Sequence, residues 1–241
     1  MAAISTPQPR FAEQLDATAH RSEWVQAWRR FRSNRLAVLG LLVVILLIFT
    51  AIFADWLVPY DPTYQFRGMR GAAPSTAHWL GSDYNGRDLF SRVLAGTQIA
   101  LMVGLGATVL QVVIGVFFGA IAGYFGGWTD TIISRLIDTL MSMPVLALLT
   151  LLAAVLRDRN VPSVLLTVLV IGFTGWARFA RIVRADVLSL RTRDFVVAAQ
   201  AGGVRSLRII FRHLLPNLVG PVIVLASLGI GGIIILEASL S

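Results

Sequence analysis

Residues 36–54, LAVLGLLVVILLIFTAIFA, form 19 consecutive positions without a charge, and Asp55 follows directly. A helix of that length rises about 28 Å, which matches the ~30 Å hydrocarbon core of a bilayer. The 35 residues before the run are too many for a short cleaved leader, so we expect a retained membrane span. Composition agrees, because 56% of the chain is hydrophobic, 14% is charged and the mean hydropathy is +0.74.

Further apolar runs follow along the chain. Residues 93–129 carry no charge over 37 positions, too many for one straight span and too few for two spans with a polar turn. We predict one helix there, at 99–122, and three more spans at 140–156, 161–176 and 217–236. Pro144 is expected to open or kink the third of the five spans. The fold class is therefore all-α, a polytopic transmembrane helical bundle.

The arginines set the orientation. All 21 basic residues are arginine. With a cytoplasmic N-terminus, the inner segments 1–35, 123–139 and 177–216 hold 15 arginines and 7 acidic residues, while the outer segments hold 6 of each. The whole excess of +8 then lies inside, as the positive-inside rule requires. Splitting 93–129 into two spans would spoil this partition, and we reject it.

Composition excludes several classes of function. The chain has no cysteine, and its three histidines lie far apart, so thiolate chemistry and common metal-ligand spacings are absent. The arginines lie between apolar runs, which argues against a nucleic-acid binder.

The N-terminal flank repeats an apolar pattern at helical spacing. Trp24, Trp28 and Phe31 fall at i, i+4 and i+7 within 22–35, which predicts an amphipathic helix in the cytoplasmic headgroup layer. A plain positive flank of the first span is the alternative. Residues 1–21 are expected to be disordered.

Two patterns near the second span concern helix contacts. Gly115, Gly119 and Gly123 recur every four residues and predict a face against which another helix packs closely, with a glycine-lined substrate path as the alternative. Arg135 and Asp138 are three apart and predict a local salt bridge, with a catalytic carboxylate as the alternative.

The segment 193–204, RDFVVAAQAGGV, lies in the arginine-rich loop 177–216. Asp194 favours a helix start, either as a cap or through the helix dipole, the alanines favour helix, and Gly202 and Gly203 end it. Phe195, Val196 and Val197 add an apolar patch in a water-facing loop. Such a patch predicts a docking surface.

These residues resemble a known family. Ala198-Ala199 with Gly203 and Leu215-Pro216 is similar to the EAA loop of ABC-importer permeases, although Val197 stands at the usual Glu and His213 at the usual Ile. The sequence RHLLPN at 212–217 and the sequence WLGSDYNGRDLFSR at 79–92 resemble the dipeptide and oligopeptide permeases. So do GYFGG at 123–127 and EASLS at 237–241, and the likeness covers roughly residues 25–241.

The resemblance implies a type I ABC-importer (MetI-like) permease that is itself no enzyme and has no cofactor, because the chain lacks a GxxxxGK[ST] loop. ATP and Mg would sit on two partner ATPase subunits, separate or fused, beside a homologous second permease, membrane lipid and an external substrate-binding protein. The location implied is the bacterial inner membrane. A sixth span is expected after residue 241. The implied domains are the N-terminal segment 1–35, the anchor 36–54, the external loop 55–92 and the permease core 93–241 with its coupling loop 177–216.

The implied ATPase-docking residues are Asp194, Phe195, Val197, Ala198, Ala199, Gly202, Gly203 and Val204. The cargo path is expected to be lined mainly by uncharged residues, with Met143, Phe173 and Trp176 as candidates. Dipeptides or oligopeptides are the expected cargo, and nickel, glutathione or haem the alternative. Met141 and Met143 beside Pro144 are interpreted as packing residues rather than soft-metal ligands. A stand-alone secondary carrier is disfavoured, because such carriers place ionisable residues inside the membrane and the five runs contain none.

The orientation is testable because the native chain lacks cysteine. Cysteines introduced at Ser75 and Ser82 should react with a membrane-impermeant maleimide added to intact cells. Labelling that occurs only after the membrane is opened would show that the topology is inverted.

Overall fold

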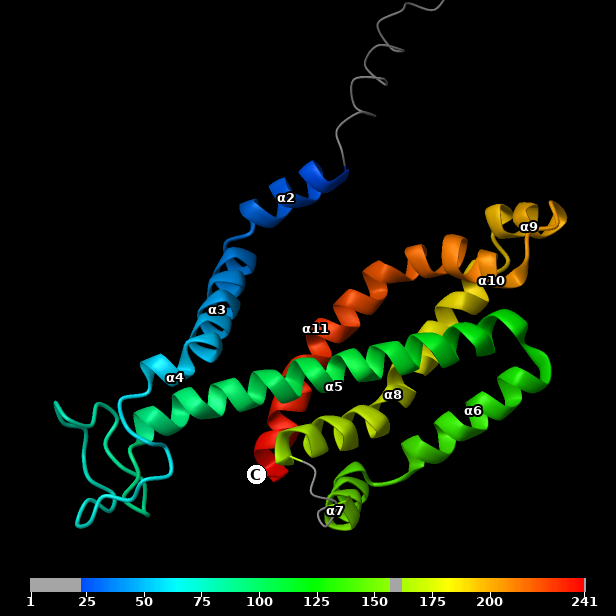
Figure 1. The fold of residues 1–241 in the computed structure, drawn as a ribbon. Helices are drawn as coiled ribbons and strands as arrows, with labels where there is room; N and C mark the ends of the chain where they lie inside the picture. The colour runs from blue at the N-terminus through cyan, green and yellow to red at the C-terminus, as the bar shows by residue number, and fades with distance from the viewer. Residues whose placement is uncertain (1–22, 157–161, 241) are drawn as a thin grey trace, which may run out of the picture. The chain divides into compact units, whose positions relative to one another are not determined.

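The computed structural model describes residues 23–156 and 162–240, so the disorder expected for 1–21 lies outside it. Within these ranges every regular element is a helix (Figure 1). Four helices are long and apolar enough to cross a membrane, and a bent helix pair makes a fifth candidate. This agrees with the prediction of five spans. The chain divides between Phe53 and Ala54 into two units, which are described separately.

The first unit contains α2 (Glu23–Ser33) and α3 (Arg35–Ile52). Asn34 separates them, because its side-chain Oδ1 accepts hydrogen bonds from the backbone N–H groups of Leu36 and Ala37 and so caps α3. The Trp28 and Phe31 rings of α2 stack with centroids 5.7 Å apart. The helix predicted at 22–35 is confirmed, and α3 is the first span.

The second unit begins with α4 (Ala54–Leu57) and, after an irregular loop, α5 (Leu89–Phe125). The single helix predicted for the long apolar run is confirmed, but the bounds 99–122 were too short. At 37 residues, α5 is about 55 Å long. It starts early because the Asp88 carboxylate caps it by accepting from the Ser91 N–H.

A sharp reversal joins α5 to α6 (Gly127–Ser142). Gly126 and Gly127 both have positive φ, 66° and 53°, which glycine adopts without a steric penalty. Met143 is extended because the following Pro144 disfavours helical backbone there, and α7 (Val145–Leu156) leaves at 90° to α6. The predicted connector 123–139 is therefore mostly helix, and the break predicted at Pro144 is confirmed, with α6 and α7 forming a bent pair as the third candidate span.

The next helix, α8 (Ser163–Leu190), continues well beyond the predicted end at 176. Two arginines of α8 are neutralised by ion pairs with α6. Arg181 binds Asp138 at 2.5 Å, and Arg184 binds Asp130 through two nitrogens. The predicted local pair of Arg135 with Asp138 is wrong, because Asp138 faces α8 instead.

Three short helical elements and one long helix complete the unit: α9 (Asp194–Ala201), α10 (Ser206–Ile209), the π-helical turn η2 (Ile210–Leu214) and the long α11 (Leu215–Leu240). Pro216 has no N–H to donate to the carbonyl of Arg212, and the Leu215 N–H bonds to the Ile210 carbonyl, which widens this turn. Figure 1 shows α9 beyond the end of α8, beside α10.

The glycines of α5 lie against α8. A Cβ atom at Gly115 would lie 2.4 Å from the Phe179 Cβ, one at Gly119 2.6 Å from the Ala180 carbonyl oxygen, and one at Gly123 2.8 Å from the Arg184 carbonyl oxygen. Real Cβ contacts are never that short, so only glycine allows this approach. We call these three residues the glycine face; they form a helix-packing surface.

Gly119→Ala tests this contact. The added methyl group meets backbone, which cannot move aside, so the free energy of unfolding should fall by about 1–3 kcal/mol. The matched control is Gly96→Ala in the same helix, where nothing lies within 4 Å of the added Cβ. That change should stabilise by up to about 1 kcal/mol through the helix preference of alanine. Thermal unfolding of the detergent-purified protein reports both, and equal midpoints for the two variants would contradict the packing role.

Candidate functional site

Val196 is the buried side chain through which the helix α9 packs against the rest of its unit. Val196 is fully buried, in a cluster built from α5, α8, α9, α10, η2 and α11. The buried members are Ala120, Val183, Val187, Val196, Ile209, Ile210, Leu214 and Leu218. We call this the anchor cluster. Val196 was predicted to be part of an exposed patch, which is wrong, because it points inward.

The opposite side of α9 is open. Phe195 is 42% exposed and Val197 49%, and Asp194, Ala198 and Gly202 are also exposed. Ala199 and Val204 are half-buried against the anchor cluster. Gly203 ends the helix with φ 74°, as its glycine suggested. The predicted docking residues thus fall into two groups: most lie on the exposed outer face, whereas Ala199 and Val204 pack against the anchor cluster.

A cavity of about 360 Å³ lies among α5, α6, α7, α8 and α11. Most of its wall is apolar, with leucines and glycines from α11. Gln111 of α5 and Thr174 and Arg178 of α8 are its polar members. Its lining is uncharged apart from Arg178.

The three residues predicted for the cargo path do not line this cavity. Trp176 is 5% exposed and packs against Ala122 and Phe118, with ring centroids 5.1 Å apart in the aromatic pair. Met143 and Phe173 are exposed at 42% and 55%. Met141, by contrast, is a lining residue. A helix turns by about 100° per residue, so neighbours of a lining residue can face elsewhere, which sequence alone could not resolve here.

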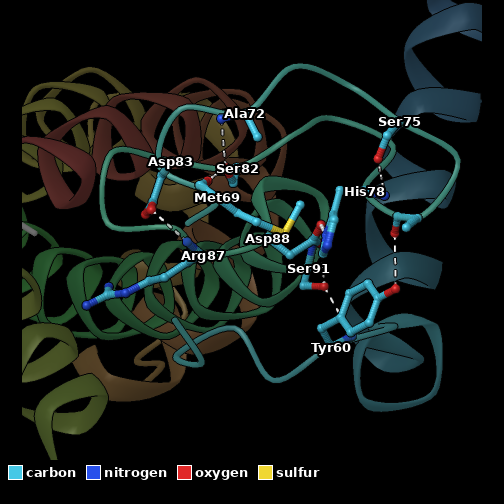
Figure 2. Close-up of polar contacts among 11 residues, drawn as sticks. Tyr60, Met69, Ala72, Ser75, His78, Ser82, Asp83, Arg87, Asp88 and Ser91 are labelled. Atoms are coloured by element: carbon cyan, nitrogen blue, oxygen red, sulfur yellow. Dashed lines mark hydrogen bonds and ion pairs between the residues drawn. The ribbon is translucent and has the colours of Figure 1, made fainter. Parts of the chain in front are cut away.

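The loop between α4 and α5, which was predicted to be external, has a buried polar centre at Asp88 (Figure 2). The Asp88 side chain is 1% exposed. Its Oδ1 lies 2.8 Å from His78 Nδ1, and its Oδ2 accepts from the Ser91 N–H at 2.8 Å and hydroxyl at 2.7 Å. The Ser91 hydroxyl in turn accepts from the Tyr60 N–H at 3.3 Å. Asp88 therefore ties the loop to the start of α5.

A second group of contacts shapes the loop tip. Asp83 accepts from the backbone N–H groups of Asn85 and Arg87 at 2.8 and 2.9 Å and pairs with Arg92. The Ser82 hydroxyl accepts from the Ala72 N–H at 3.0 Å and donates to the Met69 carbonyl. Ser75 is exposed, whereas Ser82 is half-buried, so the former is the better labelling site. The sequence did not predict the Ser82 bonds, because they join residues 10 and 13 positions apart.

These contacts lower the pKa of the two carboxyl groups. Burial raises the pKa of Asp88, but hydrogen bonds from Ser91 and His78 outweigh it, so the net shift is below the usual 3.8. The pKa of Asp83 is lowered mainly by the hydrogen bond from the Arg87 N–H. Each carboxylate thus stabilises the loop above about pH 3.8, and this stabilisation is lost as the pH falls through the lowered value.

Comparison with known proteins shows which family the chain belongs to. Residues 115–241 match the family of the binding-protein-dependent transport system inner membrane component, and residues 22–74 match the N-terminal TM domain of oligopeptide transport permease C. The chain belongs to this family of binding-protein-dependent permeases. It is a multi-pass membrane protein.

Three relatives illustrate the likeness. The oligopeptide transport system permease protein OppC of Bacillus subtilis (strain 168) is 40% identical over 91% of this chain and 71% of its own length. The dipeptide transport system permease protein DppC of Alkalihalophilus pseudofirmus is 37% identical over 98% of this chain and 77% of its own length. The glutathione transport system permease protein GsiD of Pectobacterium atrosepticum is 39% identical over 92% of this chain and 72% of its own length.

Asp88→Asn tests the polar centre of the loop. In the wild-type protein, hydrogen exchange of residues 58–88, corrected for intrinsic rates, should quicken as the pH falls below about 3.8. In the Asp88→Asn variant, the same residues should already exchange faster at pH 7 and should respond less to acid, because the charge-assisted bonds are gone. The control is Asp55→Asn, an exposed acid of α4. Identical pH profiles for wild type and Asp88→Asn would refute this role.

Proposed function

We propose that this chain is a permease subunit of an ATP-driven importer that moves dipeptides or oligopeptides inward across the plasma membrane. The supporting observation is α9, an exposed short helix fixed through Val196 to a cluster with residues of three candidate spans: α5, α8 and the segment Ser206–Ser239 that ends in α11. A helix held in this way transmits a push from a partner to the spans as a rigid body. Family membership and the printed names of the relatives support the class of cargo.

The sequence has no nucleotide-binding motif, so we assign ATP binding to partner subunits. It contains no GxxxxGK[ST] loop and no lysine, so we assign ATP and Mg to two ATP-binding subunits, separate or fused, that dock on α9. A homologous second permease would complete the translocation path. The chain itself would catalyse no reaction; it would convert closure of the ATPases into alternating access.

The external loop would receive the substrate-binding protein, with the N-terminus in the cytoplasm. The charge partition of the sequence supports this orientation. The bonds around Asp88 keep the loop in one conformation at neutral pH, and a preformed surface costs less entropy when a partner binds.

The ATPase contact would be largely apolar. Val197 stands where the resemblance places a glutamate, and its side chain is 49% exposed on α9. Together with Phe195 and Ala198 it offers small and apolar groups to a groove. A valine cannot form the ionic contact of a carboxylate, so shape complementarity would carry the docking here.

Glutathione is the second candidate cargo. The relative GsiD of Pectobacterium atrosepticum, named for glutathione transport, is as similar to this chain as the relatives named for peptides. Glutathione is itself a short peptide, so the two proposals share the same chemical demands on the path.

Ala198→Glu tests the docking role of α9. Ala198 lies on the outer face, where a glutamate would be buried without a partner in the contact. Co-purification of the ATPase subunits should fall by about tenfold, and ATP-dependent peptide uptake by reconstituted complexes should fall with it. This site is cleaner than Ala199, whose half-buried side chain supports the fold.

The charge-matched control is Gln200→Glu. Gln200 is also exposed but lies two positions further, about 200° around the helix from Ala198. It should leave assembly and uptake close to wild type. Normal assembly and uptake with Ala198→Glu would remove α9 as the docking helix.

A further inference from the structure

Three arginines follow one another at every third position of α8, and two of them are neutralised. Arg181 pairs with Asp138 and Arg184 with Asp130, both from α6. The third, Arg178, has no ion pair or hydrogen bond to any side chain within 23–156 and 162–240. It lies instead on the wall of the cavity among α5, α6, α7, α8 and α11.

Arg178 lies towards the middle of α8, and its side chain is exposed. It is the fifteenth residue after Ser163, so it lies about 22 Å along a helix that is a candidate membrane span. Ionisable side chains of membrane helices that face a cavity commonly mark a substrate pathway. An anionic group in the cavity would therefore be strongly attracted.

The other polar side chains of the wall are each engaged in a hydrogen bond within α5 and α8. Gln111 Nε2 donates to the Ile171 carbonyl at 3.0 Å, and the Thr174 hydroxyl donates to the Val170 carbonyl at 2.9 Å. No acidic side chain belongs to the lining described here. The guanidinium of Arg178 is thus the cationic group of this lining and forms no side-chain hydrogen bond within the described ranges, and its planar fork fits a carboxylate.

We propose that Arg178 binds a carboxylate group of the cargo during its passage through the permease. This inference rests on the proposed function and deepens it, because every free peptide ends in a carboxylate. The same charge repels a bare metal cation, which disfavours nickel ions as cargo. Arg178 is thereby a specificity-determining residue for anionic or zwitterionic cargo.

Uptake into proteoliposomes by the complete importer, with its binding protein, tests this assignment. The cargo is one peptide in two forms, free acid and C-terminal amide, chosen because the isolated binding protein binds both. Arg178→Met should lower uptake of the free acid by about tenfold per assembled complex and leave uptake of the amide near the wild-type value, because one charge-assisted bond is lost. Arg178→Lys keeps the charge and should retain most of the uptake of the free acid.

The control is Arg135→Met, an exposed arginine of α6 outside the cavity lining. It should change neither form. Unchanged uptake of the free acid by the Arg178→Met variant would overturn the assignment. An equal loss of uptake for both forms would also overturn it, because that result indicates a role in folding or in contact with the second permease. Failure of the proposed function looks different: the wild-type complex would then take up neither form with ATP.

Discussion

The close approach of α5 to α8 at Gly115, Gly119 and Gly123 is the contact on which the rest of the second unit depends. In a membrane, apolar side chains gain little by leaving lipid, so helices associate through close backbone packing. Here the glycine face brings the backbone of α5 within van der Waals distance of Ala180 and Arg184 on α8. That approach also positions α8 so that its arginines reach the acids of α6 and so that Arg178 borders the cavity.

The same helices connect the two ends of the unit. At the start of α5, Asp88 caps the helix and binds His78, which joins the loop between α4 and α5 to this helix. Towards its other end, Ala120 belongs to the anchor cluster that holds Val196 of α9. A displacement of α9 must therefore move the spans or break a buried apolar cluster, and the second is costly. This coupling is the physical basis for the proposal that α9 is a docking helix that acts on the spans.

The sequence predicted the number of spans, the single long second helix and the short helix near residue 194, because charges, glycines and prolines mark such boundaries locally. It failed where side chains from distant segments decide. The fourth span was placed at 161–176, with the arginines beyond it interpreted as flanks, yet α8 continues to Leu190 because α6 supplies acids that neutralise two of them. Trp176 was expected on the path, but a helix face is fixed only by its neighbours, and here they bury it.

By itself, the sequence determined that the chain crosses a membrane several times, that it carries no nucleotide loop or thiol chemistry, and that an alanine- and glycine-rich helix lies between arginine-rich segments. These are properties of composition and local spacing. Only the tertiary structure decided that Asp138 pairs with Arg181 rather than Arg135, that Val196 points inward and that Arg178 alone among the three arginines borders a cavity. Such outcomes depend on which helix lies opposite, and the partner is separated by 43 residues of chain in the case of Asp138.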